Sequence, residues 1–395
     1  MAEDITMEFG KGLPKYFMKN PSVEFLINDD NLEEIMINSA GTPVFVYHRE
    51  FGMCETNLIL KEENIMEFIK QAAEKVGENL DAENLFLNAR LPDGSRLNAT
   101  IPPATPQGAT VTIRKFRKNP LSIISLIDNG TLSSELAAYL WEMVDGERNY
   151  PLNVLVIGGS GSGKTTLLNI LSSFIRIDER VILIEDTPEL NFFDRKNVIS
   201  MESKYKGSIS EITMNDLIIN ALRMRPDRII VGEVRGEEAE SIFNAMNVGH
   251  SAMATLHANS SAESMTRLAN PPMNVPKEML GLIDLIVITT KIRTKDGLKR
   301  RIGSVVEIVR SEIGPSFSEL FSYDAKIDAI AKNSVPSQKI ERLANLTGLT
   351  KTAVISRIET KKKLIDKMQQ EKISGFMEVQ EQIKDQYDKE QLEDA

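Results

Sequence analysis

Short apolar runs and segments of helical spacing alternate through the middle of the chain. The runs at residues 153–157, 181–184, 228–231, 252–256 and 282–289 read as buried strands, and residues 302–309 read as a later edge strand. Between these runs, apolar residues recur as they do on one face of a helix. Strands that alternate with helices in this way form a doubly wound parallel sheet. The pattern therefore predicts an α/β fold for this part of the chain.

The segments on either side of this alternation have different patterns. Before it, strand-like residues 34–38, 43–47, 97–101 and 109–113 and a helix-like stretch at 60–76 predict a smaller mixed α/β domain. A helical stretch at 121–147 opens the larger domain, and helical spacing returns at 340–368 and 376–387. We expect a mixed α/β domain at 1–114, a basic connector at 115–120, the parallel-sheet domain at 121–335 and a helical region at 336–395.

Composition limits the classes of partner. The chain has 395 residues, 42% of them hydrophobic, which fits a soluble protein of two or three domains. A net charge of -10 makes a broad electrostatic contact with nucleic acid unexpected, and the single Cys54 excludes a disulfide framework. The acidic N-terminus lacks the features of a signal peptide, and the apolar stretch 279–290 is short and interrupted by Asp284, so it reads as a buried strand. We expect a cytoplasmic protein that reaches a membrane only through another protein.

The most specific motif is a glycine-rich loop directly after the first strand of the larger domain. Residues 158–165 fit G-x-x-x-x-G-K-[ST] at every fixed position and lie between a strand and a helix. Such a loop points its backbone N–H groups at the phosphates of a nucleoside triphosphate, whereas a glycine-rich turn that binds nothing is the less favoured alternative. Lys164 would reach the β- and γ-phosphates, and the Thr165 hydroxyl would ligate Mg²⁺. The predicted contact residues are Gly158, Gly159, Ser160, Gly161, Ser162, Gly163, Lys164, Thr165 and Thr166.

Acidic residues end two further strands. Glu185 and Asp186 follow the second strand at the edge where α/β sheets hold their ligands. One of them could activate water as a general base while the other orients the magnesium shell, or Asp186 could merely cap a helix. Glu233 ends the third strand in a Walker B arrangement, in which Gly232 stands where an aspartate is more common. Glu233 would hold Mg²⁺ through water or polarise the attacking water, and we expect Arg235 to be a structural partner of these acids.

Histidines and arginines complete the predicted site. His257 ends the fourth strand, where it would sense the γ-phosphate, while His250 is equally compatible with a buried structural role. Arg90, Arg96 and Arg114 lie in or next to the small domain. They could supply phosphate contacts from a second domain, although ordinary solvated arginines are the alternative.

Together these segments resemble the type II/type IV secretion ATPase superfamily, the motors of secretion systems, type IV pili and archaella. The segments that carry the resemblance are residues 90–96, 112–116, 158–165, 184–190 (the family's Asp box), 223–236 (its Walker B) and 249–259 (its His box). The residues of these boxes, together with residues 267–272 and 275–280, are most similar to those of archaeal and tight-adherence pilus members. The four-cysteine motif of many bacterial members is absent, and from the start of the chain we expect their extra N-terminal domain to be missing.

The resemblance implies a RecA-like P-loop motor domain, a hexameric ring, and ATP bound between the two domains with arginines reaching in from the N-terminal one. It implies a Mg²⁺-dependent ATP hydrolase with Lys164, Glu185, Glu233 and His257 in the catalytic site, which docks on an inner-membrane platform protein. The function would be to power assembly of a type IV pilus-like fibre or type II/IV protein secretion. Pilus retraction, conjugation-type DNA transfer and a nucleotide-gated scaffold without turnover remain alternatives, and a small-molecule kinase is weaker. Residues 343–355 could pass for a helix-turn-helix, but their acidic surroundings favour packing.

Overall fold

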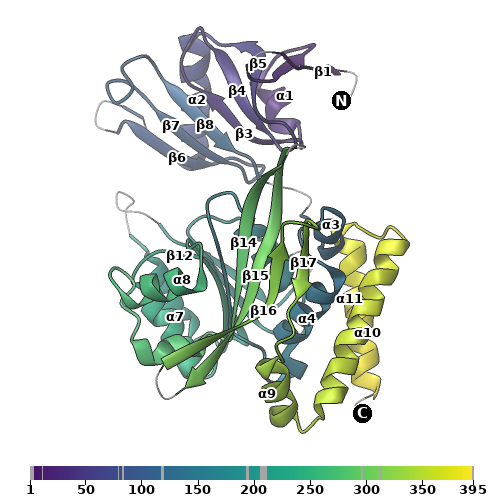
Figure 1. The fold of residues 1–395 in the computed structure, drawn as a ribbon. Helices are drawn as coiled ribbons and strands as arrows, with labels where there is room; N and C mark the ends of the chain where they lie inside the picture. Colours follow the sequence, from purple (N-terminus) through teal and green to yellow (C-terminus); the bar gives the residue numbers. More distant parts are fainter. Residues whose placement is uncertain are drawn as a thin grey trace. The chain divides into compact units, whose positions relative to one another are not determined.

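The chain divides into two compact units, shown in Figure 1. The computed structural model describes residues 4–10, 12–78, 80–81, 84–116, 120–192, 195–204, 211–294, 297–311 and 314–393. The first unit comprises Met1–Lys118 with Thr294–Leu298, and the second comprises Asn119–Arg293 with Lys299–Ala395. The division falls within the expected connector, of which residues 117–119 lie outside the described ranges. Thr294–Leu298 was expected in the larger domain, but it groups with the first unit.

The first unit is a mixed α/β layer built on an eight-stranded sheet. Its strand order is β1-β2-β5-β4-β3-β8-β7-β6, with antiparallel pairs throughout except for the parallel pair β2–β5. Alternate strand residues face a core that also receives one side of α2, because its apolar residues recur at helical spacing. The elements are β1 (Ile5–Glu8), β2 (Lys15–Met18), α1 (Val23–Asn28), β3 (Leu32–Ile37), β4 (Pro43–His48), β5 (Gly52–Ile59), α2 (Glu62–Val76), β6 (Phe86–Arg90), β7 (Arg96–Thr100) and β8 (Thr110–Arg114).

The second unit is built on a nine-stranded sheet in the order β11-β10-β12-β13-β9-β14-β15-β16-β17. The pairs from β11 to β14 are parallel, as the alternating pattern predicts, and β16 pairs antiparallel with both β15 and β17. The expected edge position of residues 302–309 is wrong, because β16 and β17 extend the sheet beyond β15. The strands are β9 (Val154–Gly158), β10 (Val181–Glu185), β11 (Val198–Glu202), β12 (Arg228–Val234), β13 (Ser251–Leu256), β14 (Leu285–Thr294), β15 (Gly297–Ser311), β16 (Gly314–Asp324) and β17 (Ala329–Lys332).

Helices cover both faces of this sheet. Along β9, Val154 and Val156 belong to one buried cluster, whereas Leu155 and Ile157 belong to the other. This division explains why the central strands are apolar at consecutive positions. The first cluster contains residues of α4 (Ser134–Asp145) and α5 (Lys164–Ser172), and the second contains residues of α6 (Met214–Ala221), α7 (Glu238–Asn247) and α8 (Ser261–Ala269).

Two segments differ from their sequence expectations. The helical stretch at 121–147 is interrupted between α3 (Ile123–Asp128) and α4, where Gly130 has a φ of +66° and Ser133 caps the second helix. The stretch at 279–290 is not one strand. It begins in the 3-10 helix η3 (Lys277–Leu282), and β14 starts only after Asp284, whose buried carboxylate accepts from Lys339 at 2.8 Å.

The C-terminal helices are part of the second unit. They are α9 (Gln338–Thr347), α10 (Lys351–Gln370) and α11 (Phe376–Glu393), and the last two lie beside α4 and the sheet in Figure 1. Leu343, Ala344 and Val354, from the segment that could pass for a helix-turn-helix, are buried in the same cluster as α4. This burial supports packing over exposure of a recognition helix.

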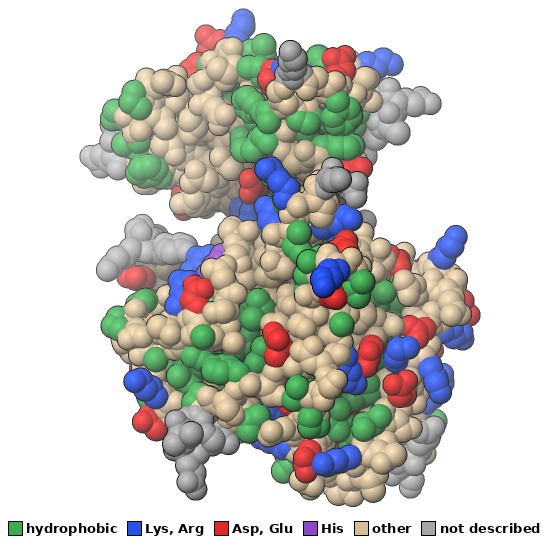
Figure 2. All heavy atoms as spheres, in the orientation of Figure 1, with side chains coloured by type: hydrophobic (Ala, Val, Ile, Leu, Met, Phe, Trp, Pro, Cys, Tyr) green, Lys and Arg blue, Asp and Glu red, His purple; other side chains and the backbone are tan. Residues whose placement is uncertain are grey.

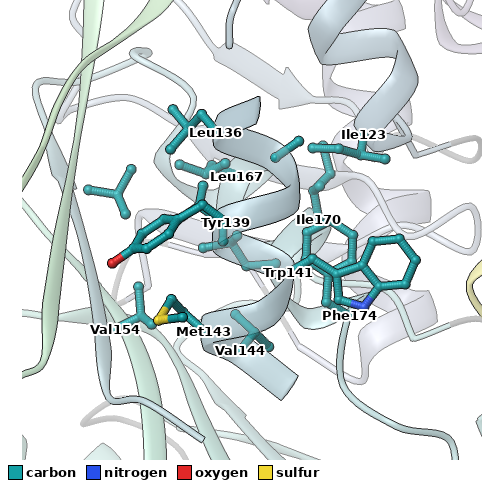
Figure 3. Close-up of a cluster of buried hydrophobic side chains, with 14 of the residues drawn as sticks. Ile123, Leu136, Tyr139, Trp141, Met143, Val144, Val154, Leu167, Ile170 and Phe174 are labelled. Atoms are coloured by element: carbon teal, nitrogen blue, oxygen red, sulfur yellow. The ribbon is translucent and has the colours of Figure 1, made fainter. Parts of the chain in front are cut away.

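A buried charged network joins these helices to α4. The ammonium of Lys361 on α10 lies 2.5 Å from Glu142 and 3.2 Å from Asp145, and all three side chains are inaccessible or nearly so. Burial by itself lowers the pKa of Lys361, but the carboxylates outweigh it and raise the pKa well above its usual value. Trp141 stacks on Phe174 beside this network (Figure 3), and its indole N–H donates to the hydroxyl of Tyr387 at 2.7 Å.

The surface of the second unit is mixed in charge. On the face that Figure 2 shows, lysine and arginine side chains are interspersed with aspartate and glutamate. Within the part of the chain that the structure describes, none of the helices combines the length and the apolar character needed to cross a bilayer.

We predict that Lys361→Met strongly destabilises the second unit. The substitution keeps an apolar side chain but takes the cation from buried Glu142 and one of the two cations from Asp145, which also pairs with Arg176, and breaking a buried ion pair costs about 3–5 kcal/mol. Lys363→Met, on the exposed side of the same helix, should change the free energy of unfolding by less than about 0.5 kcal/mol. Denaturant unfolding of both variants measures the difference, and equal stabilities would contradict the role assigned to the network.

Candidate functional site

The predicted site residues of the second unit meet at one edge of its sheet. Strands β10, β12, β13 and β9 are consecutive and parallel, so their carboxyl ends lie together. Glu185 ends β10, Glu233 lies at the end of β12, His257 follows β13, and the glycine-rich loop follows β9. The sheet topology thus brings together residues that are far apart in the sequence.

Close packing at Gly158 and an open helix terminus shape the glycine-rich loop. A Cβ atom on Gly158 would lie 2.3 Å from Oγ1 of Thr289 and 2.5 Å from Oγ of Ser162, so only glycine fits. Gly163 has a φ of +96° and leads directly into α5. The N-cap Gly163 has no side chain that could accept from the first turn of α5, and a helix N-terminus of this kind is suited to bind an anion.

Lys164, His257 and Glu233 form a chain of polar contacts across this edge. Nζ of Lys164 lies 3.1 Å from the carbonyl oxygen of Gly159, and it lies 3.3 Å from Nδ1 and 3.4 Å from Nε2 of His257. Nε2 of His257 lies 3.0 Å from Oε1 of Glu233. An ammonium only donates and a carboxylate only accepts, so Nδ1 accepts from Lys164 and Nε2–H donates to Glu233.

The pKa shifts agree with this assignment. Burial, and then the neighbouring charge of Lys164, lower the pKa of His257, so the imidazole is neutral near pH 7. Burial of Glu233 acts to raise its pKa, but the hydrogen bond and charge of Arg235, with the charge of Lys164, leave it below its ordinary value. Glu233 is therefore an ionised carboxylate, and its contact with His257 is a hydrogen bond from a neutral ring.

Arg235 connects Glu233 to the carboxylate beside β10. One guanidinium nitrogen lies 2.8 Å from Oε2 of Glu233, and another lies 3.2 Å from Oδ2 of Asp186. The expected structural role of Arg235 fits this geometry. The possible helix cap at Asp186 is wrong, because the residue lies in a bend and also accepts from the hydroxyl of Ser203.

Gly232 explains how two glutamates share this small space. A Cβ atom at position 232 would lie 3.0 Å from Cγ of Glu185, so a larger residue there would displace that side chain. The β12–β13 register shifts between Val231 and Val234, and Oγ1 of Thr255 donates to the carbonyl of Gly232 at 2.7 Å. Irregularities of this kind redirect side chains beside functional sites, here Glu233.

Glu185 is held differently from Glu233. It is buried, and its Oε1 accepts from the backbone N–H groups of Glu189 and Leu190 at 2.9 and 3.0 Å. These contacts fix the loop after β10. In contrast, the side chain of Glu233 is 20% exposed and contacts the same histidine as Lys164.

The remaining loop residues are accessible. Ser160, Gly161 and Thr166 are exposed and Thr165 is half-buried in the first turn of α5. Within the described ranges, no group of three His, Cys, Asp or Glu side chains could hold a metal ion by itself. A hydroxyl and separate carboxylates suit Mg²⁺ that keeps water and phosphate oxygens as its other ligands.

The three predicted arginines lie together in the first unit. Arg90 on β6 pairs with Arg96 on β7, and Arg96 pairs in turn with Arg114 on β8. They therefore form a row across three neighbouring strands, with Glu34 of β3 next in line. Arg90 and Arg114 are exposed and Arg96 is half-buried. The row concentrates positive charge at the same end of these three strands, and concentrated positive charge is what a phosphate-binding surface requires.

Other residues at the site were not identified from sequence. Nε of Arg300 on β15 donates to the carbonyl of Gly161 at 2.9 Å, and Thr289 on β14 contacts Ser162 at 2.8 Å. The basic run at 299–301 signals charge but not which residue faces the loop. His250 is a structural residue, since its ring contacts the carbonyl of Pro226 at 3.1 Å.

Comparison with known proteins decides the family. The model of the type II/IV secretion system protein family matches residues 19–309, most of the chain. The chain belongs to this family. An uncharacterised protein of Methanocaldococcus jannaschii is 53% identical over 232 residues, which cover 58% of this chain and 32% of that protein. Another from the same organism is matched over 52% of its length, so the chain spans a third to a half of these two relatives.

Members with descriptive names are more distant. The type IV secretion system protein VirB11 of Bartonella henselae is 29% identical over 316 residues, covering 69% of this chain and 88% of that protein. The X-ray structure of the ATPase DotB of Yersinia pseudotuberculosis has a TM-score of 0.54 and 21% identity, with 92% of each chain covered. This likeness confirms the predicted fold, a RecA-like domain with a smaller N-terminal domain and C-terminal helices.

We predict that His257 titrates below its ordinary pKa of about 6.5 in the unliganded protein, because burial and Lys164 disfavour its charged form. Lys164→Ala should raise that pKa part of the way, since burial remains. NMR titration of the three histidines, assigned with His257→Gln, measures both values. A wild-type midpoint above 6.5, or no change in Lys164→Ala, would show that the two side chains are not in contact.

Proposed function

We propose that this protein is an oligomeric ATPase that powers assembly of a pilus-like fibre or secretion of protein. The observation that carries the proposal is the chain of contacts from Lys164 through His257 to Glu233 beside a complete phosphate-binding loop. A scaffold that only binds nucleotide has no need of an ionised carboxylate held next to the phosphate lysine.

The loop and the start of α5 would bind the phosphates of ATP. Their N–H groups form the cradle, Lys164 adds charge, and the Thr165 hydroxyl is placed to ligate Mg²⁺. When bound, Mg²⁺ neutralises phosphate charge and polarises the terminal phosphoryl group. Glu233 and Glu185 complete the proposed magnesium shell, Glu233 through water.

Glu233 is the proposed general base. Its lowered pKa keeps it ionised at neutral pH, and it can accept a proton from the attacking water. His257 and Arg235 each hold one of its oxygens, which fixes the direction of the carboxylate. Glu185 lies against Gly232, the residue that precedes Glu233, so its side chain limits the space beside the base.

His257 would report the arrival of the terminal phosphate. In the structure, its Nδ1 accepts from Lys164. Phosphate oxygens compete for the same ammonium, so binding would release the imidazole from Lys164 while Nε2–H stays with Glu233. The proposed role as a γ-phosphate sensor rests on this exchange of partners.

The arginine row gives the first unit a part in the reaction. Arg90, Arg96 and Arg114 would contact phosphates from the N-terminal domain, which makes hydrolysis depend on how the units are arranged. We propose a ring of six subunits, held at the cytoplasmic side of a membrane by an inner-membrane platform protein. The family match and the relative named as a type IV secretion system protein support this setting.

We predict that Glu233→Gln keeps nucleotide affinity and lowers turnover by about 10²–10⁴-fold, because the amide retains shape but cannot accept the proton. Glu185→Gln should retain turnover within about tenfold, because its amide oxygen can still accept from the same two backbone N–H groups, whereas Glu185→Ala removes that acceptor and should lose about 1–3 kcal/mol of stability. Phosphate release, equilibrium nucleotide binding and denaturant unfolding separate the two effects. Loss of turnover only in Glu185→Gln would reverse the assignment of the base.

We predict that replacing all three of Arg90, Arg96 and Arg114 by glutamine lowers turnover by about 10³-fold at saturating ATP, because the positive charge that stabilises the transition state is lost. Each single substitution should reproduce part of the loss. Lys70→Gln, exposed on α2 of the same unit, removes one charge away from the row and serves as the control for the single substitutions. Unchanged turnover in the triple variant would restrict the phosphate contacts to the second unit.

A further inference from the structure

Two basic side chains from the β14–β15 pair lie against the outer side of the phosphate-binding loop. Nε of Arg300 donates to the carbonyl oxygen of Gly161 at 2.9 Å, and its Cδ would lie 3.5 Å from a Cβ atom on Gly163. Nζ of Lys291 would lie 3.5 Å from a Cβ atom on Gly161. Neither residue lies in a motif that the sequence analysis assigned to the site.

The contact from Arg300 fixes the direction of one peptide plane. In a trans peptide the C=O and the following N–H point in opposite directions. Because the carbonyl of Gly161 points outward to Arg300, the N–H of Ser162 points into the loop, where it lies 3.3 Å from the carbonyl of Gly159. Gly161 has a φ of +69°, and glycine alone gives this peptide little resistance to rotation.

The charges also suit a phosphate ligand. Lys164, Arg300 and Lys291 each place a positive charge against the loop: Lys164 at the carbonyl of Gly159, Arg300 at the carbonyl of Gly161, and Lys291 beside Gly161. A guanidinium that holds the loop and a second ammonium beside it both favour an anion. The two oxygens of the reacting carboxylate, Glu233, are held by His257 and Arg235. We therefore expect Arg300 and Lys291 to act on the phosphates and not on this carboxylate.

We propose that Arg300 is a positioning residue for nucleotide binding, and that Lys291 adds attraction for the same phosphates. Arg300 holds the apex of the loop in the orientation that accepts a phosphate, and it acts on affinity rather than on the chemical step. The inference rests on the proposed function, since it takes the ligand to be a nucleoside di- or triphosphate.

The test compares substitutions on one strand. Arg300→Gln should weaken binding of Mg-ADP, measured by calorimetry, by about tenfold and raise KM for ATP by a similar factor. The value of kcat at saturating ATP should stay within about threefold. Arg300→Lys should restore part of the affinity because it restores the charge, and Lys291→Gln should weaken binding by a smaller factor than Arg300→Gln.

Lys299→Gln is the matched control. Lys299 precedes Arg300 on β15, and its ammonium lies 3.5 Å from the carboxylate of Asp328. The substitution should therefore leave the affinity for ADP unchanged. Wild-type ADP affinity in Arg300→Gln, or a loss of kcat without a change in affinity, would overturn the positioning role. Lys164→Ala distinguishes a failure of the inference about Arg300 from a failure of the proposed function. If it abolishes binding while Arg300→Gln binds normally, the nucleotide site stands and the inference about Arg300 fails; if the wild type binds no nucleotide, both fail.

Discussion

The parallel pairing of β10, β12, β13 and β9 is the constraint on which the site depends. Parallel strands end on the same edge, so residues from four separate segments meet there. The shift in register at the end of β12 then directs Glu233, and the missing side chain of Gly232 leaves room for Glu185. Small changes of backbone at this edge therefore decide which carboxylate faces the phosphate lysine.

The C-terminal helices stabilise the same unit through contacts with the residues that follow α5. The hydroxyl of Tyr387 on α11 donates to the carbonyl of Phe174, and Arg176 pairs with Asp145 and Glu390. Phe174 and Arg176 directly follow α5, the helix that begins at the phosphate loop. The buried ions around Lys361 thus bind the end of the chain to the helix that carries the phosphate site. The helical tail is a structural part of the second unit.

The strong local patterns allowed most of the parallel sheet to be predicted. The central strands are apolar at consecutive positions and are bounded by glycine or acidic residues, which leaves little ambiguity. The later strands were harder to predict, because β16 carries polar residues among its apolar ones and the apolar run before β14 is shared with a 3-10 helix. The break at Gly130 also lay inside a pattern that favours one continuous helix.

The site was predicted as a set of residues but not as a set of contacts. Lys164, Glu233 and His257 follow from motifs, whereas the bond between Lys164 and His257 depends on strand order. Arg300 carries no motif, and its role emerges only from its contact with Gly161. Similarly, Arg90, Arg96 and Arg114 become a row only through the register of β6, β7 and β8. Long-range pairing is the information that a single sequence does not supply.

The most direct test of the account is phosphate release from Mg-ATP per subunit, measured across a dilution series of the full-length protein. We expect the rate of hydrolysis per subunit to rise with protein concentration, because subunits assemble into the active oligomer, and to disappear in Lys164→Ala. Hydrolysis that persists in Lys164→Ala, or no hydrolysis at any concentration of the wild type, would contradict it.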